Sequence, residues 1–376
     1  MEADITPEAL IRRASTIGGR ELDRFREAGG RVVGYSCVAT PRELLDAAGL
    51  LPYRIRALGS TARELADARM SRFNCSYCRS CLQLGLDGTY DFLDGLIETN
   101  GCDHLRGMFE NWQHDRSPGF FHYLRVPHLK NEDTHAVYLE ELELLRAALR
   151  DHFDVPISDE DLRRASARQE RVRAKLEQAQ GLRDHDPPAL SGAEALALSL
   201  LESAWPPTEF EALLDRVLAS RRRASITGRA RLLLAGSATD ELGLLQAVEE
   251  LGGLVVSDGL CYGARAFWRE SVHAGADPLR ELAAAYLDDL LCPRMFDDYE
   301  RRLAFLRQMA RRAAVDGVVL VHNKFCDIHG VDNARLRIDL EAEGTPALVL
   351  EKEYGAASDL GRIRTRVQAF IERLRR

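Results

Sequence analysis

Residues 31–55, RVVGYSCVATPRELLDAAGLLPYRI, contain the pattern from which the architecture can be inferred. An apolar run at 31–36 leads into a loop with Cys37. A helix with apolar spacing then opens after Thr40 and Pro41, and a second apolar run follows at 51–58. Strand, helix and strand in this order predict two parallel strands joined by a crossover helix.

The same alternation extends outward in both directions. Further strands are predicted at 92–99, 120–127, 230–236, 253–258, 316–323 and 346–354. One charged helix is predicted over 6–29, whereas residues 135–225 show helical periodicity and almost no strand signal.

We therefore predict an α/β fold with two flavodoxin-like or Rossmann-like parallel-sheet domains and an intervening helical segment. The N-terminal domain is expected over 1–134, the helical segment over 135–227 and the C-terminal domain over 228–376.

Composition limits the possible functions. The chain has 376 residues, 45% of them hydrophobic and 29% charged, as in ordinary soluble globular proteins. Its net charge of −8 argues against binding to nucleic acid. The sequence has no apolar stretch long enough to span a membrane. The opening MEADITPEAL does not resemble a signal peptide, so we expect a cytoplasmic protein with reduced thiols.

Eight cysteines offer the clearest chemical signal. The segment FNCSYCRSCLQ (73–83) contains Cys75, Cys78 and Cys81. Four other cysteines fall just after predicted strands, where open parallel sheets bind their ligands: Cys37, Cys102, Cys261 and Cys326.

Spacing alone leaves several interpretations of these cysteines open. They could be small buried hydrophobic residues, as we expect for Cys292. A structural zinc ion could use the local triplet with Cys102 or His104. An iron–sulfur cluster is the third interpretation, although the ferredoxin motif is absent. If a helix begins near Cys78, the three clustered thiols could hardly all reach one cluster.

Longer blocks carry a resemblance to a known family. GYSCVATPRELLDAAGLLPYRI and CSYCRSCLQLGLDGTYDFLDGLIETNGCDHLRGMFENW resemble the 2-hydroxyacyl-CoA dehydratase and benzoyl-CoA reductase family. RLLLAGSATDE, VVSDGLCYGARAFW, DGVVLVHNKFCDIHG and LEKEYGAASDLGRIRTRVQAF continue the resemblance in order. Together the blocks extend from about residue 20 to the C-terminus.

The resemblance implies a [4Fe-4S] cluster held by Cys75, Cys102 and Cys326, one from each of three blocks, with one iron left without a protein ligand. Cys78 and Cys81 would then pack nearby. The implied activity is removal of water from a 2-hydroxyacyl-CoA through a ketyl radical. The resemblance further implies an acyl-CoA thioester substrate, a paralogous second subunit or a second copy, and an ATP-dependent iron–sulfur activator.

Two related activities stay open as alternatives. One is a benzoyl-CoA reductase-type subunit. The other is a reductase of small molecules with a double-cubane cluster, for which Cys37 and Cys261 could supply additional ligands.

No catalytic residue is assigned. Asp103, His104 and Asp327 could form hydrogen bonds to the cluster or transfer protons, but residues of these types also commonly cap helices or bind loop backbone. His329 could act as an acid or a base. Ser237 and Thr239 are expected to cap the following helix, where a CoA phosphate could also bind.

Overall fold

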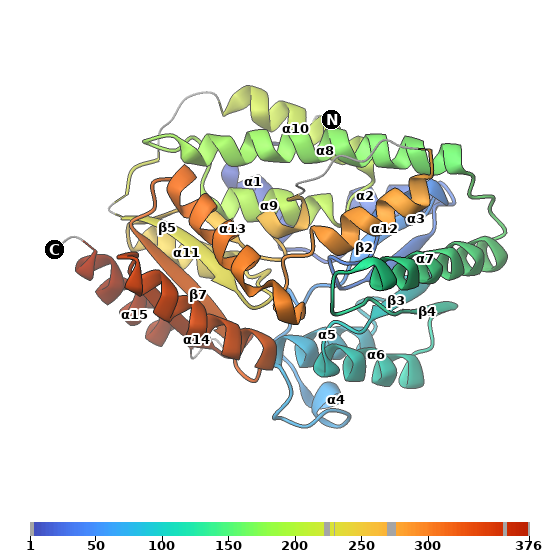
Figure 1. Ribbon diagram of the computed structural model, residues 1–376, viewed down its shortest axis with the longest axis horizontal. Coiled ribbons are helices and arrows are strands. Elements are labelled where there is room, and N and C mark those ends of the chain that lie inside the picture. Colours follow the sequence, from blue (N-terminus) through green and yellow to red (C-terminus); the bar gives the residue numbers. More distant parts are fainter. Residues whose placement is uncertain (1–3, 222–225, 229, 269–275, 356–358, 375–376) are drawn as a thin grey trace.

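The computed structural model describes residues 4–221, 226–228, 230–268, 276–355 and 359–374 (Figure 1). Within these residues the chain forms two four-stranded sheets, and every strand pairing is parallel. Helices surround both sheets, which confirms the predicted α/β class. The described helices include none that is both long enough and apolar enough to cross a bilayer.

Both sheets have the same internal order. The first runs β2-β1-β3-β4 and the second β6-β5-β7-β8. The strands of the first sheet are β1 (Val32–Tyr35), β2 (Leu51–Arg54), β3 (Gly95–Thr99) and β4 (Phe120–Leu124). Those of the second are β5 (Ala230–Gly236), β6 (Gly253–Gly259), β7 (Gly317–Asn323) and β8 (Ala347–Lys352). Such an order places a ligand-binding crevice beside the carboxyl end of the first strand of each sheet.

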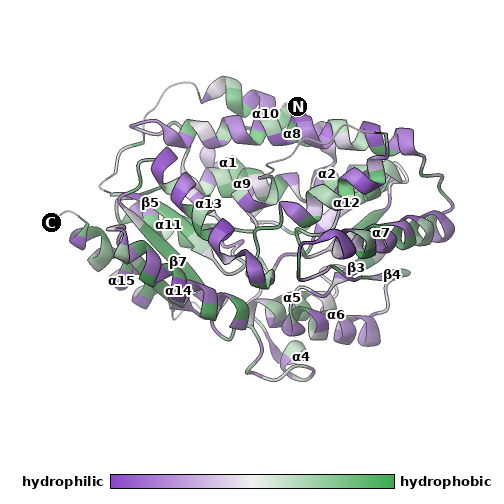
Figure 2. Cartoon of the chain, in the orientation of Figure 1, coloured by the Kyte–Doolittle hydropathy of each residue, from purple (hydrophilic) through white to green (hydrophobic). Residues whose placement is uncertain are grey.

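All eight strands lie in the predicted apolar runs. These runs are rich in Val, Leu and Ile, and all positions of β1, β2, β3 and β6 are buried. Burial on both faces is what a parallel sheet covered by helices on each side requires. Figure 2 accordingly shows hydrophobic strands inside and more hydrophilic helices such as α8 outside.

The first helix departs from the prediction. In place of one helix over 6–29, the chain forms α1 (Pro7–Ala14) and α2 (Arg20–Glu27). Gly18 and Gly19 lie between them with φ of 84° and 117°, a backbone region that other residues rarely adopt. The two glycines therefore end one helix and redirect the chain into the next.

The remaining helices connect and cover the strands. The first half contains α3 (Arg42–Ala47), α4 (Glu64–Asp67), α5 (Ser76–Leu86) and α6 (Asp103–Asp115). The middle of the chain contains α7 (Glu132–Phe153), α8 (Asp159–Asp184), α9 (Gly192–Glu202) and α10 (Pro207–Ser220). The last third contains α11 (Leu242–Glu250), η1 (Ala264–Ala266), α12 (Pro278–Asp288), η2 (Phe296–Asp298), α13 (Tyr299–Arg312), α14 (Asp327–Ala342) and α15 (Asp359–Arg373).

Helix α8 extends across both sheets (Figure 1). It begins at the cap Ser158, whose side chain and Asp161 form a capping box. Near its start Arg168 pairs with Asp46 of α3 at 2.7 Å. Near its end Arg183 pairs with Asp258 of β6 at 2.6 Å. The helix therefore fixes the position of one sheet relative to the other.

Helix α12 also crosses between the halves. It follows β6 in the sequence, yet its residues Leu282 and Tyr286 pack in one core with Leu142 of α7 and Val33 of β1. The Tyr286 hydroxyl hydrogen-bonds Glu43 at 2.6 Å. A helix of the last third of the chain therefore helps to cover the first sheet. The domain boundaries predicted at 134 and 227 remain a prediction.

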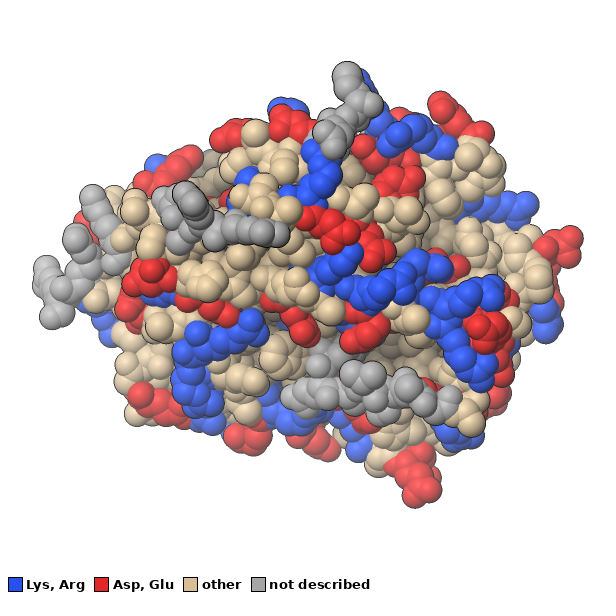
Figure 3. All heavy atoms as spheres, turned by 90° about the horizontal axis from the view of Figure 1, so that it is seen from above, with Lys and Arg blue, Asp and Glu red and all other residues tan. Residues whose placement is uncertain are grey.

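The face formed by α8 and α10 carries mixed charge. Figure 3 shows basic side chains beside acidic ones over this face. Lys175 of α8, for example, lies 2.9 Å from Glu211 and 2.7 Å from Asp215 of α10. Pairs of this kind offset part of the basic charge on this face.

Candidate functional site

Four cysteines lie where the sequence predicts them, just beyond the carboxyl ends of strands. Cys37 follows β1, Cys102 follows β3, Cys261 follows β6 and Cys326 follows β7. Because β3 and β7 occupy the same place in their sheets, Cys102 and Cys326 hold equivalent positions in the two halves.

One cavity brings together the three cysteines predicted as ligands. Its volume is about 380 Å³, and Cys75, Cys102 and Cys326 all line it. The other lining residues are Asn100, Gly101, Asp103, His104, Arg106, Tyr123, His128, Arg294, Phe296, Asp327 and Ile328. Both halves of the chain thus contribute to one site.

All three cysteines stand at the N-terminus of a helix. Cys75 caps α5, Cys102 caps α6 and Cys326 caps α14. The Cys102 sulfur also accepts the backbone N–H of Leu105 at 3.4 Å. The unpaired N–H groups and the dipole at a helix N-terminus favour negative charge. The arrangement therefore stabilises thiolates and any anionic group bound between them.

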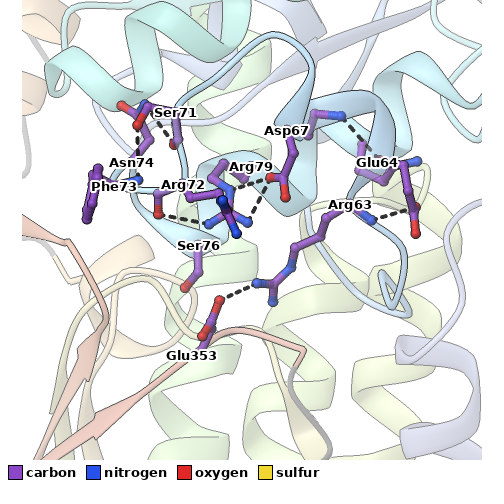
Figure 4. Close-up of polar contacts among 12 residues, drawn as sticks. Arg63, Glu64, Asp67, Ser71, Arg72, Phe73, Asn74, Ser76, Arg79 and Glu353 are labelled. Atoms are coloured by element: carbon purple, nitrogen blue, oxygen red, sulfur yellow. Dashed lines mark hydrogen bonds and ion pairs between the residues drawn. The ribbon is translucent and has the colours of Figure 1, made fainter.

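The loop before Cys75 is held down by one buried arginine. Arg79 of α5 donates to Asp67 at 2.9 Å and to the carbonyl oxygen of Arg72 at 3.1 Å (Figure 4). Further back, Arg63 pairs with Glu353, which follows β8, at 2.5 Å. These contacts give a structural reason for an arginine four residues after the first cysteine of the segment.

A fourth thiol belongs to the same group. Hydrogen bonds with the Cys326 and Cys78 thiols lower the pKa of Cys75 well below its usual value. The Cys78 thiol likewise lowers the pKa of Cys102, while that hydrogen bond raises the pKa of Cys78 itself. Cys78 therefore interacts with both Cys75 and Cys102 and is more than a remote packing residue.

The third cysteine of the triplet lies elsewhere. Cys81 is fully buried against Tyr77 and near the Asp240 carboxylate, and burial raises its pKa. Helix α5 begins at Ser76, so Cys81 lies more than one turn beyond Cys75. Cys81 is not among the described residues that line the cavity, and the difficulty of bringing all three clustered thiols to one centre stays a prediction.

The described cysteines near the cavity do not already form a coordination site for a single metal ion. Among the described residues, no set of three or more His, Cys, Asp or Glu side chains already has the geometry to hold a metal ion. A structural zinc site needs four ligands around one ion at bonding distance. Cys75, Cys102 and Cys326 line one cavity, and thiolates are the ligands that an iron–sulfur cluster takes.

Two predictions about neighbouring residues need correction. Ser237 and Thr239 do not cap α11, whose cap is Glu241. Both are fully buried: the Ser237 hydroxyl accepts the Asn323 N–H at 3.1 Å, and Thr239 donates to the Ser237 carbonyl. A hydrogen bond with the Cys75 thiol and burial raise the pKa of Cys326 well above its usual value, and a hydrogen bond with Ser237 opposes that rise. Ser237 thus supports the loop of a predicted ligand.

The acidic and histidine candidates differ in their surroundings. Asp103 and Asp327 line the cavity, but their side chains are largely exposed. The Nδ1 atom of His104 accepts a hydrogen bond from the backbone N–H of Cys75, so His104 binds loop backbone, one of the roles that the sequence suggests. His329 is buried with Nδ1 unpartnered, and burial lowers its pKa well below the usual value.

Sequence reasoning missed several residues of the cavity. His128 lies in the loop after β4, and Arg294 and Phe296 lie between α12 and α13. Arg294 is buried and donates to the carbonyl oxygens of Val126 and Pro127 at 2.7 and 2.9 Å. Only the position of His128 after a strand could have signalled a role. Arg294 and Phe296 reach the cavity through the unforeseen course of the chain after α12.

The chain is similar in sequence to several known proteins. The family model described as 2-hydroxyglutaryl-CoA dehydratase, D-component, matches residues 37–374. A benzoyl-CoA reductase polypeptide of Thauera aromatica, named as one of that enzyme's subunits, is 28% identical over 79% of each chain. The putative dehydratase subunit YjiM of Escherichia coli K12 is 28% identical over 93% of each chain. The (R)-phenyllactyl-CoA dehydratase beta subunit of Clostridium sporogenes is 24% identical over 94% of each chain.

Proposed function

The chain belongs to the 2-hydroxyglutaryl-CoA dehydratase D-component family, and from this premise we propose that it is a subunit of an iron–sulfur 2-hydroxyacyl-CoA dehydratase. The observation that supports this most is the single cavity lined by Cys75, Cys102 and Cys326. Relatives named as dehydratase subunits support the same activity class.

The three cysteines fit a [4Fe-4S] cluster by their chemistry and their placement. Thiolates are the ligands that iron–sulfur clusters take, and three of them leave one iron free of protein. Three helix N-termini would offset the negative charge of the thiolates and the cluster. When bound, the cluster would supply an electron to the thioester carbonyl, giving a ketyl radical, and a site for a substrate oxygen.

The remaining cavity residues would position the substrate and limit its contact with water. Tyr123, Phe296 and Ile328 provide apolar surface for an acyl group. Arg106 and His128 also line the cavity and can orient polar oxygens of a thioester. Arg294 already donates to two backbone carbonyls, so we assign it to shaping the wall.

We propose three partners on the same basis. An acyl-CoA thioester is the substrate, and an ATP-dependent iron–sulfur activator supplies the electron. A paralogous subunit, or a second copy of the chain, completes the enzyme, since the relatives are named as subunits. We propose that the assembly works in the cytoplasm.

Iron and sulfide analysis of anaerobically purified protein tests the ligand set. Wild type should hold about four irons per chain, the content of one cubane. Cys75→Ser, Cys102→Ser and Cys326→Ser should each lose most of this iron, whereas Cys81→Ser and Cys292→Ser should keep it. Iron that stays in the first three variants would disprove the assignment. Cys78→Ser then shows whether Cys78 replaces Cys75 as the ligand.

A benzoyl-CoA reductase-type subunit is the second candidate, favoured by the similarity to the Thauera aromatica polypeptide. Product analysis distinguishes the two. An enoyl-CoA formed from a 2-hydroxyacyl-CoA supports the dehydratase, and a reduced ring formed from benzoyl-CoA supports the reductase. About eight irons per chain would instead support the double-cubane alternative, with Cys37 and Cys261 as further ligands.

A further inference from the structure

His104 belongs to the segment that carries Cys102, and its imidazole contacts the two segments that carry Cys75 and Cys326. His104 lies in the first turn of α6, shortly after Cys102. Its Nδ1 accepts a hydrogen bond from the backbone N–H of Cys75 at 3.0 Å. Its Nε2 lies 3.5 Å from a carboxylate oxygen of Asp327, the residue that follows Cys326.

We infer that His104 is a positioning residue that aligns the Cys75, Cys102 and Cys326 segments before a cluster binds. The inference rests on the proposed ligand set, but it concerns the arrangement of the chain itself. Residues that orient metal ligands contribute to affinity because they fix the ligands in advance.

The geometry of the ring limits its role to positioning. Since Nδ1 accepts the Cys75 N–H, the ring hydrogen stands on Nε2, toward Asp327. Neither nitrogen is then free to bind iron or to take a proton from substrate. The Asp327 side chain is 83% exposed, so that contact is weak, and the Cys75 hydrogen bond is the stronger of the two.

Two further contacts link the Cys75 and Cys326 segments. The Ser76 N–H approaches the Lys324 carbonyl oxygen at 3.4 Å. The rings of Phe73 and Phe325 meet edge to face at 5.6 Å. Both contacts link the Cys75 and Cys326 segments without involving Cys102, whereas His104 brings that segment into the same arrangement.

The backbone before Cys326 also depends on its surroundings. Phe325 has φ of 66°, in the left-handed region that residues with a side chain seldom occupy. Such a conformation persists where neighbouring contacts hold it. The position of Cys326 therefore depends on contacts between the segments. Removal of one such contact should change that position measurably.

Disulfide formation in the cluster-free full chain tests the alignment directly. The Cys75 and Cys326 side chains line the same cavity, so a limiting thiol oxidant should join them. Peptide mass spectrometry then measures the rate at which this disulfide appears. Four variants are compared with wild type: His104→Ala, His104→Asn, His104→Gln and His114→Ala.

The expected order follows from which nitrogen each variant imitates. His104→Ala should slow the disulfide severalfold. His104→Asn places an oxygen where Nδ1 was, so it should recover most of the wild-type rate. His104→Gln imitates Nε2 and should stay close to His104→Ala. His114 is exposed at the far end of α6, and His114→Ala should behave as wild type.

Two results would overturn the inference. One is a wild-type rate in His104→Ala, and the other is a His104→Asn rate no better than that of His104→Ala. Melting temperatures measured alongside identify a variant that has simply failed to fold, in which case the Asn and Gln variants decide. Iron affinity provides a second measurement, with a loss of about tenfold or more expected in His104→Ala.

The disulfide rates separate this inference from the proposed function. If wild type binds no iron, the proposed ligand set fails, yet the disulfide rates still report on His104. If wild type binds its cluster and the rates do not depend on His104, only the positioning role fails.

Discussion

Glu98 is an acidic residue within a buried strand. It belongs to β3, pairs in register with Tyr123 of β4, and is 2% exposed. Its Oε1 has no hydrogen-bond partner. Burial, with a smaller contribution from Glu110, raises the pKa of this carboxyl to about 8, while Arg106 opposes the shift. The folded chain therefore keeps a proton on Glu98 at neutral pH, beside a wall of the cavity.

Glu98→Gln should change how stability depends on pH. An unfolded glutamate ionises near pH 4.3, about 4 units below the folded value. Between these limits the folded chain holds a proton that the unfolded chain has lost, so the free energy of unfolding falls as pH rises. The variant lacks this titration, and wild type should lose stability relative to it by at most about 1.4 kcal/mol per pH unit.

Urea denaturation of the cluster-free chain at pH 5, 6, 7 and 8 measures this difference. Glu209→Gln, an exposed change on α10, serves as the control and should run parallel to wild type. Parallel curves for wild type and Glu98→Gln would show that Glu98 ionises normally in the folded chain.

Arg79→Lys should loosen the segment that carries Cys75. Lysine keeps the charge but cannot donate to Asp67 and to the Arg72 carbonyl at once. We expect a loss of about 1–3 kcal/mol in the free energy of unfolding and a lower iron content. Arg72→Lys, at an exposed neighbouring position, is the control. Equal stability of the two variants would mean that the fork of Arg79 contributes little.

Helices α5 and α6 together carry two of the predicted ligands, and their spacing depends on a glycine. A Cβ added at Gly85 of α5 would lie 2.5 Å from the ring of Trp112 in α6. The indole is rigid and 3% exposed, so it has little room to move. The close approach of the helices thus sets the relation between the Cys75 and Cys102 ends.

Gly85→Ala should therefore destabilise the chain although alanine is the better helix former. Overpacking costs about 1–3 kcal/mol, and the gain in helix propensity offsets up to about 1 kcal/mol of it. Gly243→Ala in α11 is the matched control, because no atom lies within 4 Å of its added Cβ. That variant should gain stability, and thermal denaturation should give shifts of opposite sign. A stabilised Gly85→Ala would contradict the packing argument.

At the scale of the whole molecule, the two halves share their cores. One hydrophobic cluster includes Leu82 of α5 together with Leu233 of β5, and so spans both sheets. The second cluster combines β1 with α7 and α12. Helix α8 is paired with both halves through Arg168 and Arg183. These connections favour a single cooperative unit.

A fragment of residues 1–134 should consequently fail to fold on its own. It lacks α7 and α12, which cover Val33, Leu44 and Ile97 on one face of the first sheet. Circular dichroism should show no sharp thermal transition, and the fragment should bind an apolar dye, unlike the full chain. A sharp transition would instead support the predicted boundary at 134.

The sequence predicts local features better than the meeting of distant segments. Apolar runs are enough to find all eight strands and the positions of Cys102 and Cys326 after them. The break at Gly18 and Gly19 is hidden within a charged helical pattern. The return of α12 to the first sheet depends on tertiary packing, which periodicity does not encode. For the same reason, the placement of Cys78 and the His104 contacts could not be predicted.

The distribution of the predicted ligands over both halves has a consequence for motion between the halves. Cys75 and Cys102 belong to one half and Cys326 to the other, so anything bound to all three spans the seam between them. A group bound to all three thiols would act as a cross-link that restricts motion of one half relative to the other. Loss of the bound group would remove this restriction. A cluster at the proposed site would in this way join the two halves of the chain.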